Sequence, residues 1–176
     1  LSEGVRSTTV TTTGAVVIES VGAAFTAPLD TTSLSLTSGA ASLRLGKSTN
    51  TANITVGAAS VAGPIEVNGG AVSLNAGLTT TNSSTGNITI RSSTLTGSGG
   101  LSLANGRSLS ITQSGDSVYT GVIAGTDVTL TKAGAGRLGL TASNTFSGGS
   151  TVSAGSLGVY SNDAVGTGAI SLNANT

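Results

Sequence analysis

Four carboxylates are the candidates for acid–base chemistry in this sequence: Glu66, Asp116, Asp127 and Asp163. The general acid and base of an enzyme that cleaves polysaccharides lie within about 5 to 10 Å of each other. Along the chain these residues are separated by 50, 11 and 36 positions, which is no constant interval. Only Asp116 and Asp127 are placed to share one turn of a repeating fold. We therefore expect isolated, solvated charges and no catalytic residue.

Three charged residues alternate with aliphatic ones. Arg44 stands between two leucines, Glu66 stands between Ile65 and Val67, and Arg91 follows Ile90. If these segments are strands, all three side chains point outward. The pattern predicts a weak surface ladder of ion pairs. The alternative is that these side chains bind a host glycan.

Lys132 and Arg137 bracket a glycine-rich segment, Ala-Gly-Ala-Gly. A phosphate-binding loop needs Lys directly after Gly and before a Ser or Thr that opens a helix. That spacing is missing here, and no helix is expected. We therefore assign this segment to a turn.

The aromatic residues are Phe25, Tyr119, Phe146 and Tyr160. A sugar-binding platform would need them on one face, whereas they are scattered over 135 positions, so packing in the core or in turns is the expectation. The chain has no cysteine and no histidine. Thiol and imidazole metal sites are therefore excluded, and we expect neither a metal nor a cofactor.

The composition bounds the class of protein. The net charge is zero, with seven basic and seven acidic residues spread singly, so nothing predicts binding to nucleic acid. Charged residues make up only 8%, but Val, Ile, Leu and Thr are abundant, which favours an ordered all-β chain over disorder. No apolar run approaches the roughly 20 residues of a membrane helix, so we expect no membrane insertion by this segment. Because the chain begins at Leu1 without an initiator, we expect a fragment of a longer protein.

Short strands must position these side chains. Aliphatic residues recur two positions apart, which puts both members of each pair on one face of a strand. Examples are Ile54 and Val56, Ile88 and Ile90, Leu138 and Leu140, Leu157 and Val159, and Ile170 and Leu172. Gly and Asn between the pairs indicate tight turns.

Longer intervals separate comparable strands. The distances from Ile54 to Val72, Ile88 to Leu109 and Leu138 to Leu157 are 18, 21 and 19 residues, and others fall between 16 and 19. A near-constant interval favours a solenoid over a sandwich. We predict a right-handed parallel β-helix with about 19 residues per coil, about nine coils and a length of roughly 40 Å.

The pattern is unequal along the chain. Residues 1–33 contain one good strand candidate around Val16 and are interrupted by Pro28, so we interpret them as an irregular first coil or a preceding segment. Residues 34–176 form the predicted solenoid, and residues 121–176 carry its most regular repeat. We expect the stack from Ile54 to Leu172 to be the better ordered part.

The last third of the chain resembles the autotransporter-associated β-strand repeat of bacterial passenger regions. The residues that match its pattern are Lys132, Gly134, Gly136, Leu138, Leu140, Asn144, Thr145, Phe146, Gly148, Gly149, Thr151, Val152, Ala154, Gly155 and Leu157. Residues 63–77, GPIEVNGGAVSLNAG, are similar to the repeats of filamentous haemagglutinin-like adhesins exported by two-partner secretion.

These resemblances imply a secreted surface adhesin or autotransporter passenger of a Gram-negative bacterium, in which this segment is a rod-like stalk for adhesion and presentation. They transfer no catalytic residue. The partners they imply are a host or bacterial surface glycan or protein and the rest of a longer parent chain. The alternative is a carbohydrate-active β-helix enzyme, either a polysaccharide lyase or a hydrolase.

Overall fold

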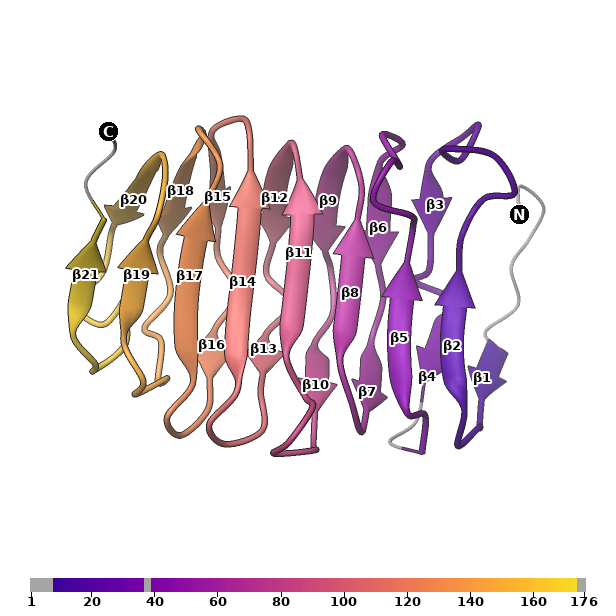
Figure 1. The fold of residues 1–176 in the computed structure, drawn as a ribbon, viewed down its shortest axis with the longest axis horizontal. Helices are drawn as coiled ribbons and strands as arrows, with labels where there is room; N and C mark the ends of the chain where they lie inside the picture. The colour runs from indigo at the N-terminus through magenta and orange to yellow at the C-terminus, as the bar shows by residue number, and fades with distance from the viewer. Residues whose placement is uncertain (1–7, 37–38, 174–176) are drawn as a thin grey trace.

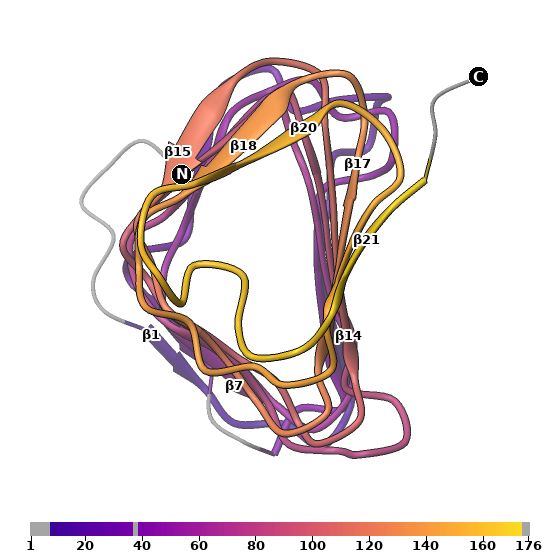
Figure 2. The ribbon, with the colours of Figure 1, turned by 90° about the vertical axis from the view of Figure 1, so that its left-hand side faces the viewer.

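The computed structural model describes residues 8–36 and 39–173, and every regular element in them is a β-strand. The strands wind as a right-handed solenoid in which each strand pairs in parallel with its equivalent one coil later (Figure 1). Seen along its axis, the solenoid encloses a roughly triangular core (Figure 2). The predicted fold class is confirmed.

The coil has three walls. Wall A contains β1 (Thr8–Val10), β4 (Leu34–Leu36), β7 (Ala59–Val61), β10 (Leu78–Thr80), β13 (Leu101–Ser102) and β16 (Ile123–Ala124). Wall B contains β2 (Ala15–Ile18), β5 (Ser42–Leu45), β8 (Ile65–Asn68), β11 (Ile88–Ser92), β14 (Ser108–Gln113), β17 (Thr129–Ala133), β19 (Ser150–Val152) and β21 (Ile170–Leu172).

Wall C consists of two sheets in succession. The first contains β3 (Leu29–Asp30), β6 (Ile54–Val56), β9 (Ala71–Leu74) and β12 (Thr94–Gly97), and the second contains β15 (Ser117–Tyr119), β18 (Arg137–Leu140) and β20 (Ser156–Val159). The backbone amide of Thr120 donates to the carbonyl oxygen of Gly97 at 3.0 Å, which joins the two sheets. We call the turns from wall A to wall B the AB corner and those from wall B to wall C the BC corner.

The strand register measures the coil. Along wall B the paired residues Leu43, Ile65, Ile88, Leu109, Leu130 and Ser150 follow one another at 22, 23, 21, 21 and 20 positions. The predicted interval of about 19 was too short, since the coils are about 21 residues apart, and about seven coils replace the expected nine. Seven steps of about 4.8 Å give a stack of about 34 Å rather than 40 Å.

The error in the interval came partly from comparing strands of different walls and partly from coils of unequal length. Ile54 and Val72 are true partners 18 residues apart, and so are Leu138 and Leu157 at 19. Val72 and Ile88, however, lie in walls C and B. The strands of the three walls are equally short and aliphatic, so alternation alone does not distinguish the walls.

Two columns of inward side chains run along wall B. The first contains Leu43, Ile65, Ile88, Leu109 and Leu130, and the second contains Leu45, Val67, Ile90, Ile111, Lys132 and Val152. All of these side chains are buried. Each aliphatic residue stacks on its equivalent in the next coil, which fills the narrow core with small side chains. Lys132 is the exception in the second column.

Burial falls at the C-terminal end of the stack. Ile170 and Leu172 of β21 are 52% and 75% exposed, and Val159 of β20 is 52% exposed. Leu157 of β20 is partly buried against the core, so the expected inward face persists there, whereas both members of the Ile170 and Leu172 pair are exposed. A strand in a stack is covered by a coil on each side, whereas β21 pairs with β19 only and β20 with β18 only.

The first coil is the longest and least regular one. It spans 27 residues from Val16 to Leu43. Residues 8–33 nevertheless carry β1, β2 and β3, and each pairs in parallel with the following coil. Of the two interpretations left open for residues 1–33, these pairings favour an irregular first coil for the part that the structure describes.

Candidate functional site

The candidate acid–base pair lies at opposite ends of wall B. Asp116 is in the BC corner, where a carboxylate oxygen accepts a hydrogen bond from the backbone amide of Arg137 at 2.8 Å. Asp127 is in the AB corner, and its backbone amide donates to the Ser147 hydroxyl at 2.8 Å. The six-residue strand β14 spans such a wall, which is about 20 Å at 3.3 Å per residue. This separation exceeds the reach of an acid–base pair.

The other two candidate carboxylates join neither of them. Glu66 projects outward from the middle of wall B. Asp163 is exposed in the C-terminal turn, where its backbone carbonyl oxygen accepts from the backbone amide of Asn144 at 3.0 Å. Within residues 8–36 and 39–173, no three His, Cys, Asp or Glu side chains are grouped so as to hold a metal ion.

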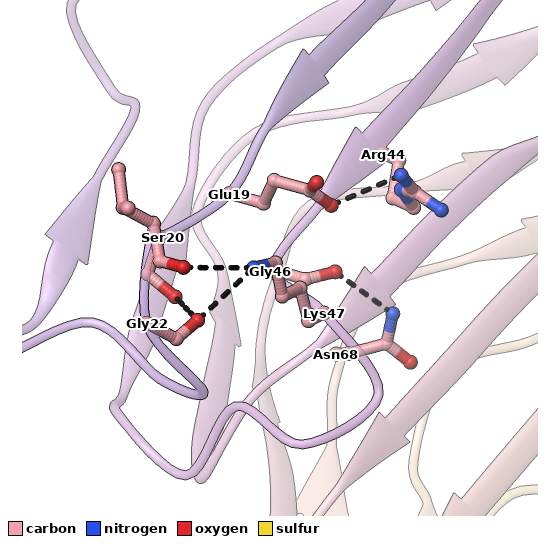
Figure 3. A network of polar contacts seen from close by, with 8 residues as sticks. Glu19, Ser20, Gly22, Arg44, Gly46, Lys47 and Asn68 are labelled. Atoms are coloured by element: carbon pink, nitrogen blue, oxygen red, sulfur yellow. Dashed lines mark hydrogen bonds and ion pairs between the residues drawn. The ribbon is translucent and has the colours of Figure 1, made fainter.

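The outward charges of wall B form the predicted ladder, and it is one residue longer than expected. Arg44 pairs with Glu19 of the first coil at 3.0 Å (Figure 3), and Arg91 pairs with Glu66 at 2.7 Å. Arg44 and Glu66 are register partners in neighbouring coils. The charges therefore alternate as Glu19, Arg44, Glu66 and Arg91 over four coils, and we call this the charge ladder. Its members are substantially exposed, so each pair contributes at most about 1 kcal/mol.

Two shallow hollows flank the last member of the ladder. The first, with a volume of about 500 Å³, lies over wall B and is lined by Arg44, Glu66, Thr89 and Arg91 among others. The second, of about 450 Å³, lies at the BC corner. Hydroxyl and amide side chains dominate its lining, and Arg91 is its one charged residue.

Buried side-chain amides support the BC corner. Asn68 donates to the Gly46 carbonyl at 3.0 Å (Figure 3), and the Asn50 amide donates to the Asn68 carbonyl at 2.9 Å. Two coils later, the Gln113 amide donates to the Gly115 and Arg137 carbonyls, both at 2.9 Å. Each of these bonds satisfies a backbone carbonyl in or next to a turn.

Lys132 occupies an inward position of wall B and is fully buried. Its ammonium group donates to the carbonyl oxygens of Ala133 at 2.8 Å, Gly134 at 2.9 Å and Ala154 at 3.3 Å. The first two belong to its own corner and the third belongs to the next coil. The buried cation therefore connects two successive coils through backbone oxygens.

Burial lowers the pKa of Lys132 below its ordinary value of 10.5, because a charged amine loses its hydration inside the core. The negative charge of Asp116 opposes part of this effect. The three carbonyl dipoles supply the partners that a buried charge requires.

The turn beside Lys132 has the predicted glycine chemistry. Gly134 has φ +77°, and a Cβ atom there would lie 2.2 Å from the Gln113 carbonyl oxygen. The assignment of Ala-Gly-Ala-Gly to a turn is confirmed. What the prediction missed is that Lys132 belongs to the core, although its position two residues after inward Leu130 was a usable signal.

A second buried polar side chain connects coils on the opposite side of the core. The Asn144 carbonyl oxygen accepts from the backbone amide of Ile123 at 2.7 Å, and its amide donates to the Ala164 carbonyl at 2.5 Å. These backbone partners lie 21 residues before and 20 residues after it. We call Lys132 and Asn144 the coil clamps.

The aromatic residues separate into core and surface. Tyr119 and Phe146 are fully buried, as expected for core packing. Tyr160 is half exposed, and the Arg137 guanidinium lies 5.1 Å from the centre of its ring. The four aromatics therefore form no shared platform.

The part of the chain that the structure describes contains no helix with the length and apolar character needed to cross a membrane.

Comparison with family models identifies one repeat. Residues 130–159 match the passenger-associated transport repeat, which includes both coil clamps and all fifteen residues of the resemblance noted in the sequence. Comparisons with curated proteins and with solved structures found no match. The similarity of residues 63–77 to filamentous adhesins stays a prediction.

Proposed function

We propose that this chain is a shaft segment of a secreted bacterial surface protein of the autotransporter class, and that the shaft presents an adhesive region away from the cell. The main support is that the residues matching the passenger repeat continue the same parallel stack as the rest of the described chain. The repeat and the solenoid both fit an autotransporter passenger stalk. Adhesion, a Gram-negative source and cell-surface location are parts of the proposal.

The arrangement suits a structural role. Each coil contacts its neighbours only, so length can be added or removed in whole coils. Stability comes from repeated backbone pairing and from stacked aliphatic columns rather than from one central cluster. The alternative function, a carbohydrate-active enzyme, receives no support from the carboxylates among the described residues, because Asp116 and Asp127 are a wall apart.

The experiment is a pair of deletions in the protein expressed by its own bacterium. Removing residues 65–108 deletes two whole coils, because Ile65, Ile88 and Leu109 are register equivalents. Removing residues 65–97 deletes about one and a half coils and brings a strand of wall A to the place of wall B. Surface exposure is measured by antibody staining of intact cells, and adhesion by cell attachment.

The proposal predicts that the two-coil deletion keeps surface exposure and most adhesion, whereas the out-of-register deletion loses both. Equal loss of surface exposure in both deletions would contradict a modular shaft. Unchanged surface exposure and adhesion in both deletions would contradict the proposal that this segment presents an adhesive region.

A further inference from the structure

The charge ladder ends on a cation. Its members alternate from Glu19 to Arg91, and the residue that pairs with Arg91 in the next coil is Thr112, which is uncharged. Among the described residues, Arg91 bonds only through Nη1, to Glu66 at 2.7 Å and to the Asn68 side-chain oxygen at 3.4 Å. The Arg91 side chain is 51% exposed, so its remaining N–H donors are accessible to a ligand.

Arg91 forms part of the lining of the hollow at the BC corner. The lining also includes Asn53, Asn68, Ser92, Ser93 and Ser114. Asn53, Ser93 and Ser114 are exposed residues of this lining. Their amide and hydroxyl groups can donate to and accept from a ligand in the hollow.

The chemistry of the hollow selects a class of ligand. A guanidinium group binds carboxylates through two parallel hydrogen bonds, and Lys cannot reproduce this geometry. Hydroxyl and amide side chains both donate and accept, which suits a ligand rich in hydroxyl groups. An apolar peptide side chain would need an apolar pocket, and this hollow is lined by polar residues and glycine.

We propose that Arg91 and the BC-corner hollow bind an acidic glycan, with the carboxylate of a uronic acid on the Arg91 guanidinium and the sugar hydroxyls on the Ser93 and Asn53 side chains. This inference deepens the proposed adhesive function and rests on it. The bound carboxylate occupies the position in which the alternating ladder lacks its next negative charge. Because the net charge of the chain is zero, general attraction of polyanions contributes little.

The test uses the purified chain and a galacturonate hexamer, with binding followed by calorimetry and by chemical shifts. Saturable binding at millimolar or lower concentration is expected. Arg91→Gln should weaken it at least about tenfold, since a charge-assisted contact is lost. Ser93→Ala should weaken it severalfold. Arg44→Gln is the matched control, because it removes the other arginine of the ladder, and it should bind within about twofold of the parent.

Circular dichroism of each variant establishes that the fold is retained, which is expected because both arginines are exposed. The fully methyl-esterified hexamer should not bind, since it lacks the charge. Absence of binding by the parent, or equal binding by Arg91→Gln, would overturn the site. Equal binding of poly-glutamate would overturn the glycan class. None of these results decides surface display, which the deletions in the bacterium measure separately.

Discussion

The central coils and the matched repeat use the same inward columns of wall B differently. In β8, β11 and β14 the second column is aliphatic, with Val67, Ile90 and Ile111. In β17 the equivalent position is Lys132, and in β19 the first column holds buried Ser150, whose hydroxyl donates to the Val165 carbonyl at 3.3 Å. An inward polar group is therefore compatible with the stack wherever turn carbonyls converge on it.

The aliphatic and the polar residues of the core therefore have different roles. The aliphatic columns stabilise the stack but specify its register weakly, since one small apolar side chain packs much like another. The buried polar groups accept only one arrangement of backbone partners, so they specify which turn lies above which. The matched repeat contains three of these groups, Lys132, Asn144 and Ser150, while Asn68 and Gln113 make comparable bonds in the central coils.

The largest expected effect comes from placing the cation one coil too early. Ile111→Lys puts an amine at the register position before Lys132. The nearby carbonyls of Gly115 and Arg137 already bond to Gln113, and the neighbouring cation repels the new one. We expect a loss of about 3–5 kcal/mol in the free energy of unfolding. Urea titration measures it, and a stability equal to that of the parent would show that carbonyl partners do not decide where a charge is tolerated.

Removing the natural cation should have a smaller effect. Lys132→Met keeps an unbranched side chain but leaves the Ala133, Gly134 and Ala154 carbonyls without their donor, at a cost of about 1–3 kcal/mol. Lys47→Met is the matched control, because Lys47 donates to the Val21 and Gly22 carbonyls at 3.3 and 3.1 Å on the surface (Figure 3). The control should change stability by less than about 0.5 kcal/mol. A Lys132→Met variant more stable than the parent would exclude the clamp.

The lowered pKa of Lys132 makes the free energy of unfolding depend on pH, and this effect should be smaller than that of Lys132→Met. Because the unfolded chain holds this proton more tightly than the folded one, stability rises as pH increases from the folded pKa toward 10.5. The parent should therefore gain stability relative to Lys132→Met between pH 7 and about 9.5. Melting curves of both proteins check this. The pH range of this test stops below 10 because of Tyr119. Burial raises the pKa of its hydroxyl above the ordinary value of 10.0, so the folded state loses stability when the pH exceeds 10.

The smallest effect is expected on the surface. Arg91→Ala removes an exposed ion pair and should change the free energy of unfolding by about 0.5 kcal/mol or less. A loss as large as that of Lys132→Met would mean that the charge ladder, and not the core, holds these coils together.

Much of the fold could be predicted because successive side chains of a strand point to opposite faces, so alternating aliphatic residues indicate a strand with one buried face. Ile88 and Ile90 had to face one way and Arg91 the other, and the structure agrees. The coil length was harder to predict, because it depends on which strands pair between successive coils, and the strands of the three walls have similar sequences. The passenger-type repeat was recognisable from its turn and core residues, and Lys132 was among the residues that matched its pattern.

The remaining features depend on contacts between distant residues. The Ala154 carbonyl that meets Lys132 is 22 residues away, and the Glu19 partner of Arg44 lies in the segment that appeared least regular. The direction of a side chain depends only on its position in its own strand, so the alternation of inward and outward residues predicts it. Partners across coils require the register, which a single sequence leaves open.

The most direct test of the stacked-coil account is a distance ruler along wall B. Val17, Ser110, Thr131 and Thr151 occupy one outward register position, which runs from Val17 through Arg44, Glu66 and Thr89 to the other three. The chain has no cysteine to interfere with labelling. Spin labels on Val17→Cys paired in turn with Ser110→Cys, Thr131→Cys and Thr151→Cys span four, five and six coils. The account predicts separations that rise by about 4.8 Å per coil, from about 19 to 29 Å. Separations that fail to rise with each added coil would contradict it.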